Sequence, residues 1–266
     1  MRTDFQQFYV PPEQVGAETF FLSGDEHHHA SRVLRKQVGD VISAVDGMGS
    51  LYEGRIHEMR RDQTVVEIMQ MNKNVGEPKL RLVLAQAALK GGHFDLVIEK
   101  GVEIGVFAFQ PMITDRVIAR PEKSDRWRKK AIGAMKQCGR SYCPDVYDPV
   151  DFPSLFENNE SDLLLIAHEE INPEVNDALD RLDGAATVTV FIGPEGGFTD
   201  AEIRFALDQG AHPISLGPRR LRAETAAIVA ATKVLSAAGE MGGAGILSLT
   251  RGDETSGVSF LQDKSG

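Results

Sequence analysis

The sequence is poor in cysteine, because its 266 residues include only Cys138 and Cys143. Two thiols are too few for a disulfide framework, and a single pair without a second pair does not indicate a zinc site. No run of about eighteen apolar residues occurs, so no membrane-spanning helix is predicted. The first residues lack the apolar core of a signal peptide. We therefore expect a protein of the reducing cytoplasm that binds neither a membrane nor a metal.

Familiar phosphate-binding motifs are also missing. No G-x-x-x-x-G-K-[ST] sequence occurs, which excludes a P-loop, and no G-x-G-x-x-G follows the first strand of the second half, which disfavours an ordinary dinucleotide site. His27, His28 and His29 are consecutive. Consecutive side chains diverge on a helix, and no carboxylate or thiol set completes a metal site.

The composition is that of a globular protein, with 42% hydrophobic and 26% charged residues, and the length allows one large or two modest domains. The net charge of −10, taken whole, argues against a nucleic-acid partner. However, residues 115–140 hold nine Lys/Arg against three Asp/Glu, while residues 151–185 hold ten Asp/Glu against one Arg. The basic segment is therefore either a solvated face or a nucleic-acid surface.

Residues 1–72 have the pattern of a small β-barrel with one helix. Short β-rich runs lie at residues 20–22, 41–45, 51–56 and 64–68. A helix is expected near residues 25–37. Polar residues 72–78, which include Gly76 and Pro78, predict a linker after the barrel.

The remainder alternates between strands and helices, which predicts an α/β domain with a parallel sheet. Strands are expected at residues 80–85, 107–113, 163–167 and 187–192, and helices at 93–104, 124–138, 174–182 and 223–239. Thr199 and Glu202 fit a capping box, and Gly210 fits the end of that helix. Trp127 is expected in the core rather than stacked on a base. Small residues of the last helix suit packing on the sheet or on a second subunit. The Gly/Ser-rich residues 242–266 predict a flexible tail.

Two loops rich in glycine and proline follow apolar runs at residues 193–197 and 216–222. Glycine lets a backbone approach a ligand closely, and open α/β sheets bind ligands at strand ends. Taken alone, the first loop is equally compatible with a tight turn. The second loop places three arginines and Glu224 near a helix start, where free N–H groups suit an acceptor-rich ligand. Together the loops predict a site for a nucleotide-like cofactor.

These loops carry a specific resemblance. GPEGGF at residues 193–198 and LGPRRLRAETA at residues 216–226 resemble the signature of the RsmE family of SPOUT-type RNA methyltransferases. Arg220 stands where an aliphatic residue is usual in that family. The resemblance continues in other segments of the chain, at residues 29–35, 46–49, 90–91, 99–106 and 137–141. It implies a PUA-like RNA-binding barrel over residues 1–72 and a SPOUT α/β methyltransferase domain with a C-terminal trefoil knot over residues 73–241.

The resemblance also implies S-adenosylmethionine as cofactor and N3 of a uridine in the decoding region of 16S ribosomal RNA as the methylated atom. A homodimer acting on the assembled small subunit is expected. The implied cofactor-binding residues are Gly193, Pro194, Glu195, Gly196, Gly197, Leu216, Gly217, Leu221 and Ala226. The implied RNA-binding residues are His29, Arg32, Arg35, Arg116 and Arg140.

The implied catalytic residues are Arg222, Glu224 and Arg219. Uridine N3 carries a proton that must be removed, so an arginine is expected to stabilise the developing anion and a general base to accept the proton. Glu224 is either that base or a salt-bridge partner of Arg222.

Three other functions remain open from the sequence. The chain could be a SPOUT enzyme that acts on another RNA or on a 2′-hydroxyl group. It could be a non-enzymatic RNA-binding module, or an enzyme that uses both loops for a phosphorylated metabolite.

Overall fold

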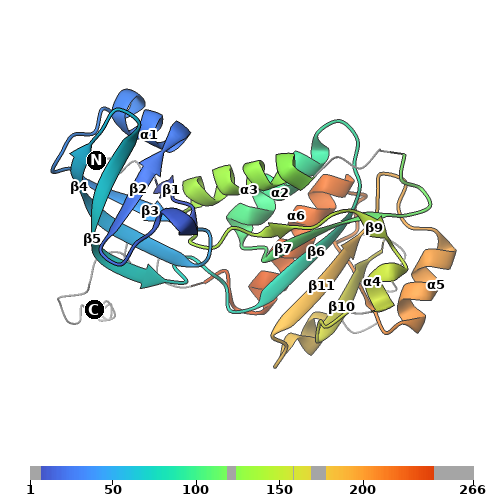
Figure 1. Ribbon diagram of the computed structural model, residues 1–266. Coiled ribbons are helices and arrows are strands. Elements are labelled where there is room, and N and C mark those ends of the chain that lie inside the picture. Colours follow the sequence, from blue (N-terminus) through green and yellow to red (C-terminus); the bar gives the residue numbers. More distant parts are fainter. Residues whose placement is uncertain (1–6, 119–123, 158, 169–177, 243–266) are drawn as a thin grey trace, which may run out of the picture.

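The computed structural model describes residues 7–118, 124–157, 159–168 and 178–242. They form a small N-terminal β domain and a larger α/β domain, which lie side by side with helix α3 (Ser124–Cys138) between them (Figure 1). Within these ranges, no helix has the length and apolar character needed to cross a membrane.

The N-terminal domain is a five-stranded sheet in the order β1-β3-β4-β5-β2. Its strands are β1 (Gln7–Tyr9), β2 (Thr19–Ser23), β3 (Val41–Val45), β4 (Ser50–Met59) and β5 (Gln63–Lys73). β1 runs parallel to β3 and the other pairs are antiparallel. Alternate residues such as Phe8, Phe20 and Ile56 form one buried core. The four predicted strands are confirmed, whereas the three-residue β1 was not predicted.

The helix expected near residues 25–37 is shorter than predicted. It begins as α1 (Gly24–His28), continues as a π-helical turn over His29–Val33, and ends before Arg35. Arg35 has a φ of 51°, a left-handed conformation that a helix cannot continue through. The side chains of Arg32 and Arg35 are both exposed.

The second domain contains a parallel sheet in the order β12-β10-β11-β6-β7-β8, with β9 also paired to β7. Its strands are β6 (Arg81–Ala87), β7 (Ala108–Ile113), β8 (Asp145–Val146), β9 (Val150–Asp151), β10 (Leu163–Ala167), β11 (Thr187–Ile192) and β12 (His212–Ile214). Each described pairing in this sheet is parallel. The prediction of an α/β domain with a parallel sheet is confirmed.

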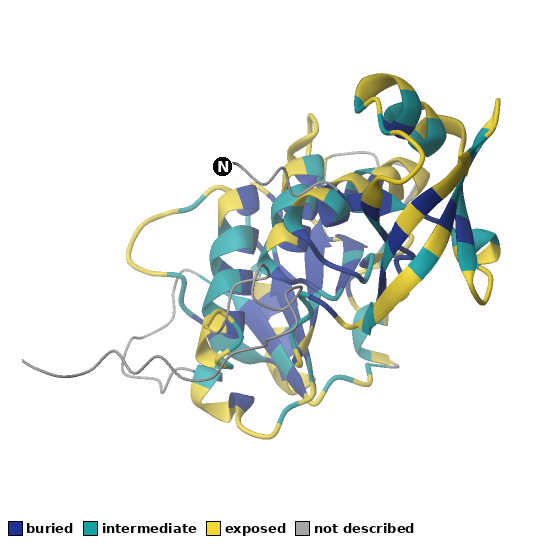
Figure 2. Ribbon diagram, turned by 90° about the vertical axis from the view of Figure 1, so that its left-hand side faces the viewer, coloured by how far each residue is buried: buried dark blue, intermediate teal, exposed yellow. Residues whose placement is uncertain are grey.

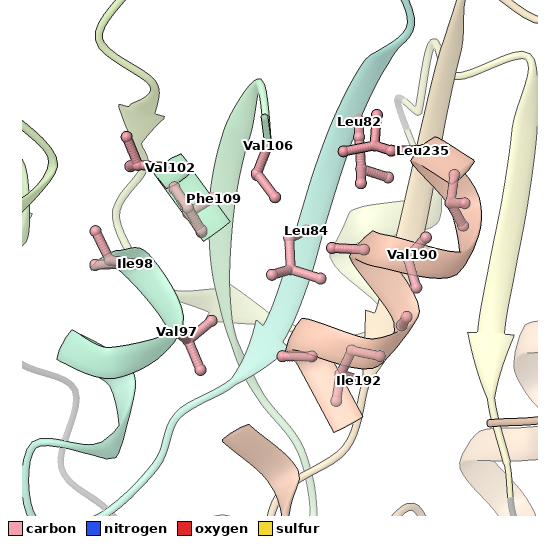
Figure 3. Packing of buried hydrophobic residues seen from close by; sticks show 14 of the residues in the cluster. Leu82, Leu84, Val97, Ile98, Val102, Val106, Phe109, Val190, Ile192 and Leu235 are labelled. Atoms are coloured by element: carbon pink, nitrogen blue, oxygen red, sulfur yellow. The ribbon is translucent and has the colours of Figure 1, made fainter. Parts of the chain in front are cut away.

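Helices cover both faces of this sheet. On one face α2 (His93–Ile104) and α6 (Ala223–Ala237) pack with side chains such as Leu84 and Val190 in one core (Figure 3), and α3 packs against α2. The buried alanines of α6 belong to this core, so they pack inside the chain. Trp127 is 3% exposed and lies against the ring of Phe94, which confirms its place in the core.

The other face is covered by α4 (Ser154–Glu157) and α5 (Asp200–Asp208), with a cluster of aromatic rings around Phe152 and Phe191. Figure 2 shows the buried residues gathered along the strands, with exposed residues on the outer sides of the helices.

The sequence signals predicted for the two ends of α5 are confirmed. The capping box of Thr199 and Glu202 is present, and Gly210 has the positive φ of 86° expected after α5. Of the helix predicted at 174–182, only a 3-10 turn over Ala178–Leu182 lies in the described part, and residues 174–177 lie outside it. Residues 243–266 of the predicted tail also lie outside the described residues.

Candidate functional site

A cavity of about 730 Å³ opens at the carboxyl ends of the parallel strands. β10 and β11 lead into it directly, and the segment after β12 closes one side before α6 begins. The start of α2 and the segment after β7 complete the wall. The cavity therefore occupies the position at which open α/β sheets bind ligands.

The structure brings both predicted loops into this one cavity. All of the residues predicted for the cofactor and for catalysis line it, namely Gly193, Pro194, Glu195, Gly196, Gly197, Leu216, Gly217, Arg219, Leu221, Arg222, Glu224 and Ala226. Arg116, predicted as an RNA contact, lies there too, together with Arg220, His93 and His168. The two loops are separate segments of the sequence, and the sheet brings their backbones together.

The first loop needs glycine because its backbone folds back on itself. A Cβ on Gly193 would lie 3.1 Å from the backbone nitrogen of Phe198 and 3.2 Å from the carbonyl carbon of Gly197. The Gly197 N–H donates to the Pro194 carbonyl at 2.9 Å, and Gly197 has a φ of 70°. The loop is thus a tight turn and also a cavity wall built from backbone.

Neighbouring segments hold this loop in place. The Arg116 guanidinium donates to the carbonyls of Gly196 at 2.8 Å and Phe198 at 3.0 Å. The Lys90 N–H donates to Glu195 at 3.2 Å. Arg116 therefore has a structural role that the sequence did not predict, although its exposed side chain still faces the cavity.

Gln86 is a further residue that the sequence analysis missed. It is fully buried at the end of β6, and its amide donates to the carbonyls of Ile192 at 3.4 Å and Gly193 at 3.2 Å. A lone amide side chain in the apolar run Leu82–Ala88 is the signal that could have identified it.

The second loop presents its arginines at the mouth of the cavity. Arg219, Arg220 and Arg222 are exposed and line it, and Arg222 is the N-terminal capping position of α6. The Gly217 φ of 108° turns the chain here, and Lys233 donates to the Ser215 carbonyl at 2.8 Å. A cationic mouth beside a wall of backbone groups suits a polyanion next to an adenosyl-type ligand.

Glu224 pairs with an unexpected residue. Its Oε1 lies 3.4 Å from Nδ1 of His93, and its side chain is 9% exposed. Of the two roles left open for Glu224, the salt bridge to Arg222 is not among the ion pairs of the described residues. His93 takes that place, and no sequence signal connected residues so far apart.

The predicted RNA contacts divide into two groups. Arg32 and Arg35 are exposed on the N-terminal domain, outside the cavity, and His29 packs edge-on against Phe8. Arg140 requires a correction, because it is 2% exposed. Its guanidinium donates to Glu77 and to the carbonyls of Val102 and Val106, so it joins the segments of the fold and is not available to RNA.

No group of three or more His, Cys, Asp or Glu side chains suited to a metal ion occurs among the residues that the structure describes. The charged residues of the cavity include four arginines, and Glu195, Asp200 and Glu224 lie beside them.

Comparison with known proteins agrees with this architecture. Residues 76–235 match the model of an RNA methyltransferase domain, and residues 22–69 match that of an RNA methyltransferase PUA domain. The ribosomal RNA small subunit methyltransferase E of Synechocystis sp. is 33% identical over 85% of this chain and 75% of its own length. That of Bacillus subtilis is 28% identical over 82% of this chain and 90% of its own length.

Solved structures show the same similarity. The ribosomal RNA small subunit methyltransferase E of Neisseria gonorrhoeae, bound to S-adenosyl methionine, is 28% identical, with a TM-score of 0.78 over 87% of this chain and 97% of that one. A methyltransferase of Legionella pneumophila in complex with the same cofactor is 32% identical, with a TM-score of 0.77 over 89% and 98% of the two chains. The resemblance found in the sequence is confirmed: this chain belongs to the ribosomal RNA small subunit methyltransferase E family.

Proposed function

We propose that this chain transfers a methyl group from S-adenosylmethionine to N3 of a uridine in the decoding region of small-subunit (16S) ribosomal RNA. The observation that carries the proposal is the meeting of both family loops in one cavity at the carboxyl ends of the parallel strands. Family membership and the cofactor-bound relatives support the same activity.

The cavity fits the cofactor in size and in chemistry. Its volume of about 730 Å³ is within the range of small-molecule sites. Both loops line the cavity with glycine-rich backbone, whose hydrogen-bonding groups a ligand can approach closely. These residues would hold S-adenosylmethionine, which supplies an electrophilic methyl group.

The reaction requires a charge-stabilising group beside that cofactor. Removal of the N3 proton leaves negative charge on the uridine, and a fixed guanidinium lowers the energy of that anion. We assign this role to Arg222, with Arg219 beside it, because both line the cavity at the start of α6. The protein otherwise acts by positioning the two reactants.

We propose that RNA contacts the N-terminal domain as well as the mouth of the cavity. Residues 1–72 would contact RNA through His29, Arg32 and Arg35, and residues 73–241 would carry the transfer. The net charge of −10 disfavours free RNA and favours an assembled ribosomal particle, whose shape adds contacts that charge alone does not supply. Such a substrate places the activity in the cytoplasm.

Two further features belong to this proposal. In the strand order β12-β10-β11-β6-β7, the last strand, β12, lies at one edge of the sheet. The chain then returns, and α6 packs against β6 and β11 in the middle of the sheet, which supports a SPOUT-type trefoil knot.

The proposal also includes a homodimer, to be tested by light scattering. Its support no longer includes the alanine stripe of α6, which packs inside the chain.

Calorimetric titration with S-adenosylmethionine tests the cofactor assignment. We expect saturable binding at one site per chain. Absence of binding at millimolar cofactor would reject every methyltransferase interpretation of the cavity and leave an RNA-binding module or a metabolite enzyme.

A further inference from the structure

Two helices begin side by side at the cavity, and each contributes one titratable side chain there. His93 is the first residue of α2 and Glu224 is the second residue of α6. Their side chains differ in exposure, at 46% for His93 and 9% for Glu224, and Nδ1 lies 3.4 Å from Oε1. Both line the cavity in which the cofactor and the uridine are proposed to meet.

The arrangement distinguishes the two ring nitrogens, because Nδ1 is the one that approaches Glu224. When Nδ1 carries a proton and donates it toward Glu224, the unprotonated Nε2 is a proton acceptor. A carboxylate on Nδ1 holds the ring orientation and stabilises the imidazolium that forms when Nε2 takes up a proton.

Glu224 is less suited to be the proton acceptor itself. It sits in the first turn of α6, with its carboxylate directed at Nδ1 of His93. It is also nearly buried, whereas half-exposed His93 has a route for returning a proton to water. The shared geometry therefore favours the histidine as base and the glutamate as its positioning residue.

We infer that His93, oriented by Glu224, accepts the N3 proton of the target uridine. This inference rests on the proposed methyl transfer. The N3–H bond breaks and its proton moves to Nε2 of His93. The freed electron pair of N3 forms the bond to the methyl carbon as the carbon–sulfur bond breaks, which leaves S-adenosylhomocysteine. The imidazolium then releases its proton to water.

Charged residues of both signs lie on the elements around His93. Lys90 precedes α2, Arg222 caps α6, and Oε1 of Glu224 approaches Nδ1 of the ring at 3.4 Å. Asp95 of α2 is already paired with Arg126 of α3 at 2.6 Å. Glu195 accepts a hydrogen bond from the Lys90 N–H. Glu224 is thus the carboxylate in direct contact with the ring.

The test compares His93→Gln and His93→Ala with the wild-type chain on small ribosomal subunits from a strain that lacks this protein. Gln keeps an amide near Glu224 but has no basic nitrogen, and His57→Gln, on the exposed side of β4, is the matched control. We expect both His93 variants to lose about 100-fold in kcat with unchanged cofactor affinity by calorimetry. Added imidazole should raise the rate of His93→Ala but not that of His93→Gln.

The pH profile gives a readout that a structural role would not change. The wild-type kcat should fall on the acid side as an imidazole protonates, and that limb should disappear in His93→Gln. Wild-type kcat in His93→Gln, or an unchanged acid limb, would overturn the inference while N3 methylation by the wild-type chain still stands. A wild-type chain that leaves N3 unmethylated would overturn the proposed function and this inference with it.

Discussion

At the scale of single residues, burial separates the roles of two arginines, Arg140 and Arg222. Arg140 is enclosed, with its guanidinium bound to Glu77 and to the carbonyls of Val102 in α2 and Val106 after it. Arg222 is exposed at the mouth of the cavity. The same type of side chain therefore stabilises the fold at Arg140 and is available to stabilise charge on a ligand at Arg222.

Substitution of Arg140 should unfold the chain more easily. Arg140→Met leaves the Glu77 carboxylate, 11% exposed, without its guanidinium partner and two carbonyls without a donor, which should lower the free energy of unfolding by about 3–5 kcal/mol. Urea unfolding followed by circular dichroism measures this loss. The exposed Arg204→Met on α5 is the control and should change stability little. Equal stability of the two variants would contradict the structural role of Arg140.

Substitution of Arg222 should affect chemistry rather than cofactor binding. Arg222→Ala removes the cation assigned to the developing uridine anion, so kcat should fall about 100-fold or more while the cofactor Kd stays nearly constant. Single-turnover methyl transfer and calorimetry separate the two effects. If Arg222→Ala keeps the activity of the wild-type chain, Arg222 has no part in the reaction.

At the scale of elements, the predictable parts were those specified by local patterns. The bounds of α2, α3, β10 and β11 agree with their apolar periodicity and flanking residues. β1 was missed because three residues give no period, and the first helix ended early because of the left-handed Arg35.

The candidate site was likewise predictable only where local sequence patterns specify it. The glycine and arginine loops could be predicted because each is a continuous motif. The partners His93, Gln86 and Glu77 could not, because each contact joins residues that only the folded sheet brings together. Arg140 was misassigned for that reason, since its charge was visible in the sequence and its burial was not.

The turn at residues 193–197 should tolerate no side chain at its start. Gly193→Ala places a Cβ against the backbone of Phe198 and Gly197, so the loop must shift and the cofactor Kd should rise about tenfold or more. Calorimetry measures the change. Gly133→Ala on α3, where a Cβ would meet open space, is the matched control and should leave the Kd unchanged. An unaltered Kd in Gly193→Ala would show that this turn does not shape the cofactor site.

At the scale of the whole molecule, the two domains share contacts that make them one unit. Val45 and Leu51 of the N-terminal domain lie in the core of the α/β domain, and Lys136 of α3 pairs with Glu26 of α1. The Gly49 N–H donates to the Ser141 carbonyl at 3.0 Å. Removal of residues 1–72 would expose this shared core, so point substitutions are the better test of RNA binding.

Reversal of charge on the N-terminal domain should weaken RNA binding alone. The double variant Arg32→Glu, Arg35→Glu should bind small ribosomal subunits at least tenfold more weakly and with a smaller salt dependence, because fewer phosphates are contacted. Filter binding at several salt concentrations measures both effects, and calorimetry should show unchanged cofactor affinity. Unchanged subunit binding would assign RNA recognition to another surface.

The activity itself is tested by mass-spectrometric mapping of ribosomal RNA. Small subunits from a strain lacking this protein are incubated with the purified chain and S-adenosylmethionine, and their RNA is then digested and sequenced by mass. We predict one added methyl group, on N3 of a uridine in the decoding region of the small-subunit RNA. A methyl group on a ribose, on another RNA or on no nucleotide would contradict the proposed function.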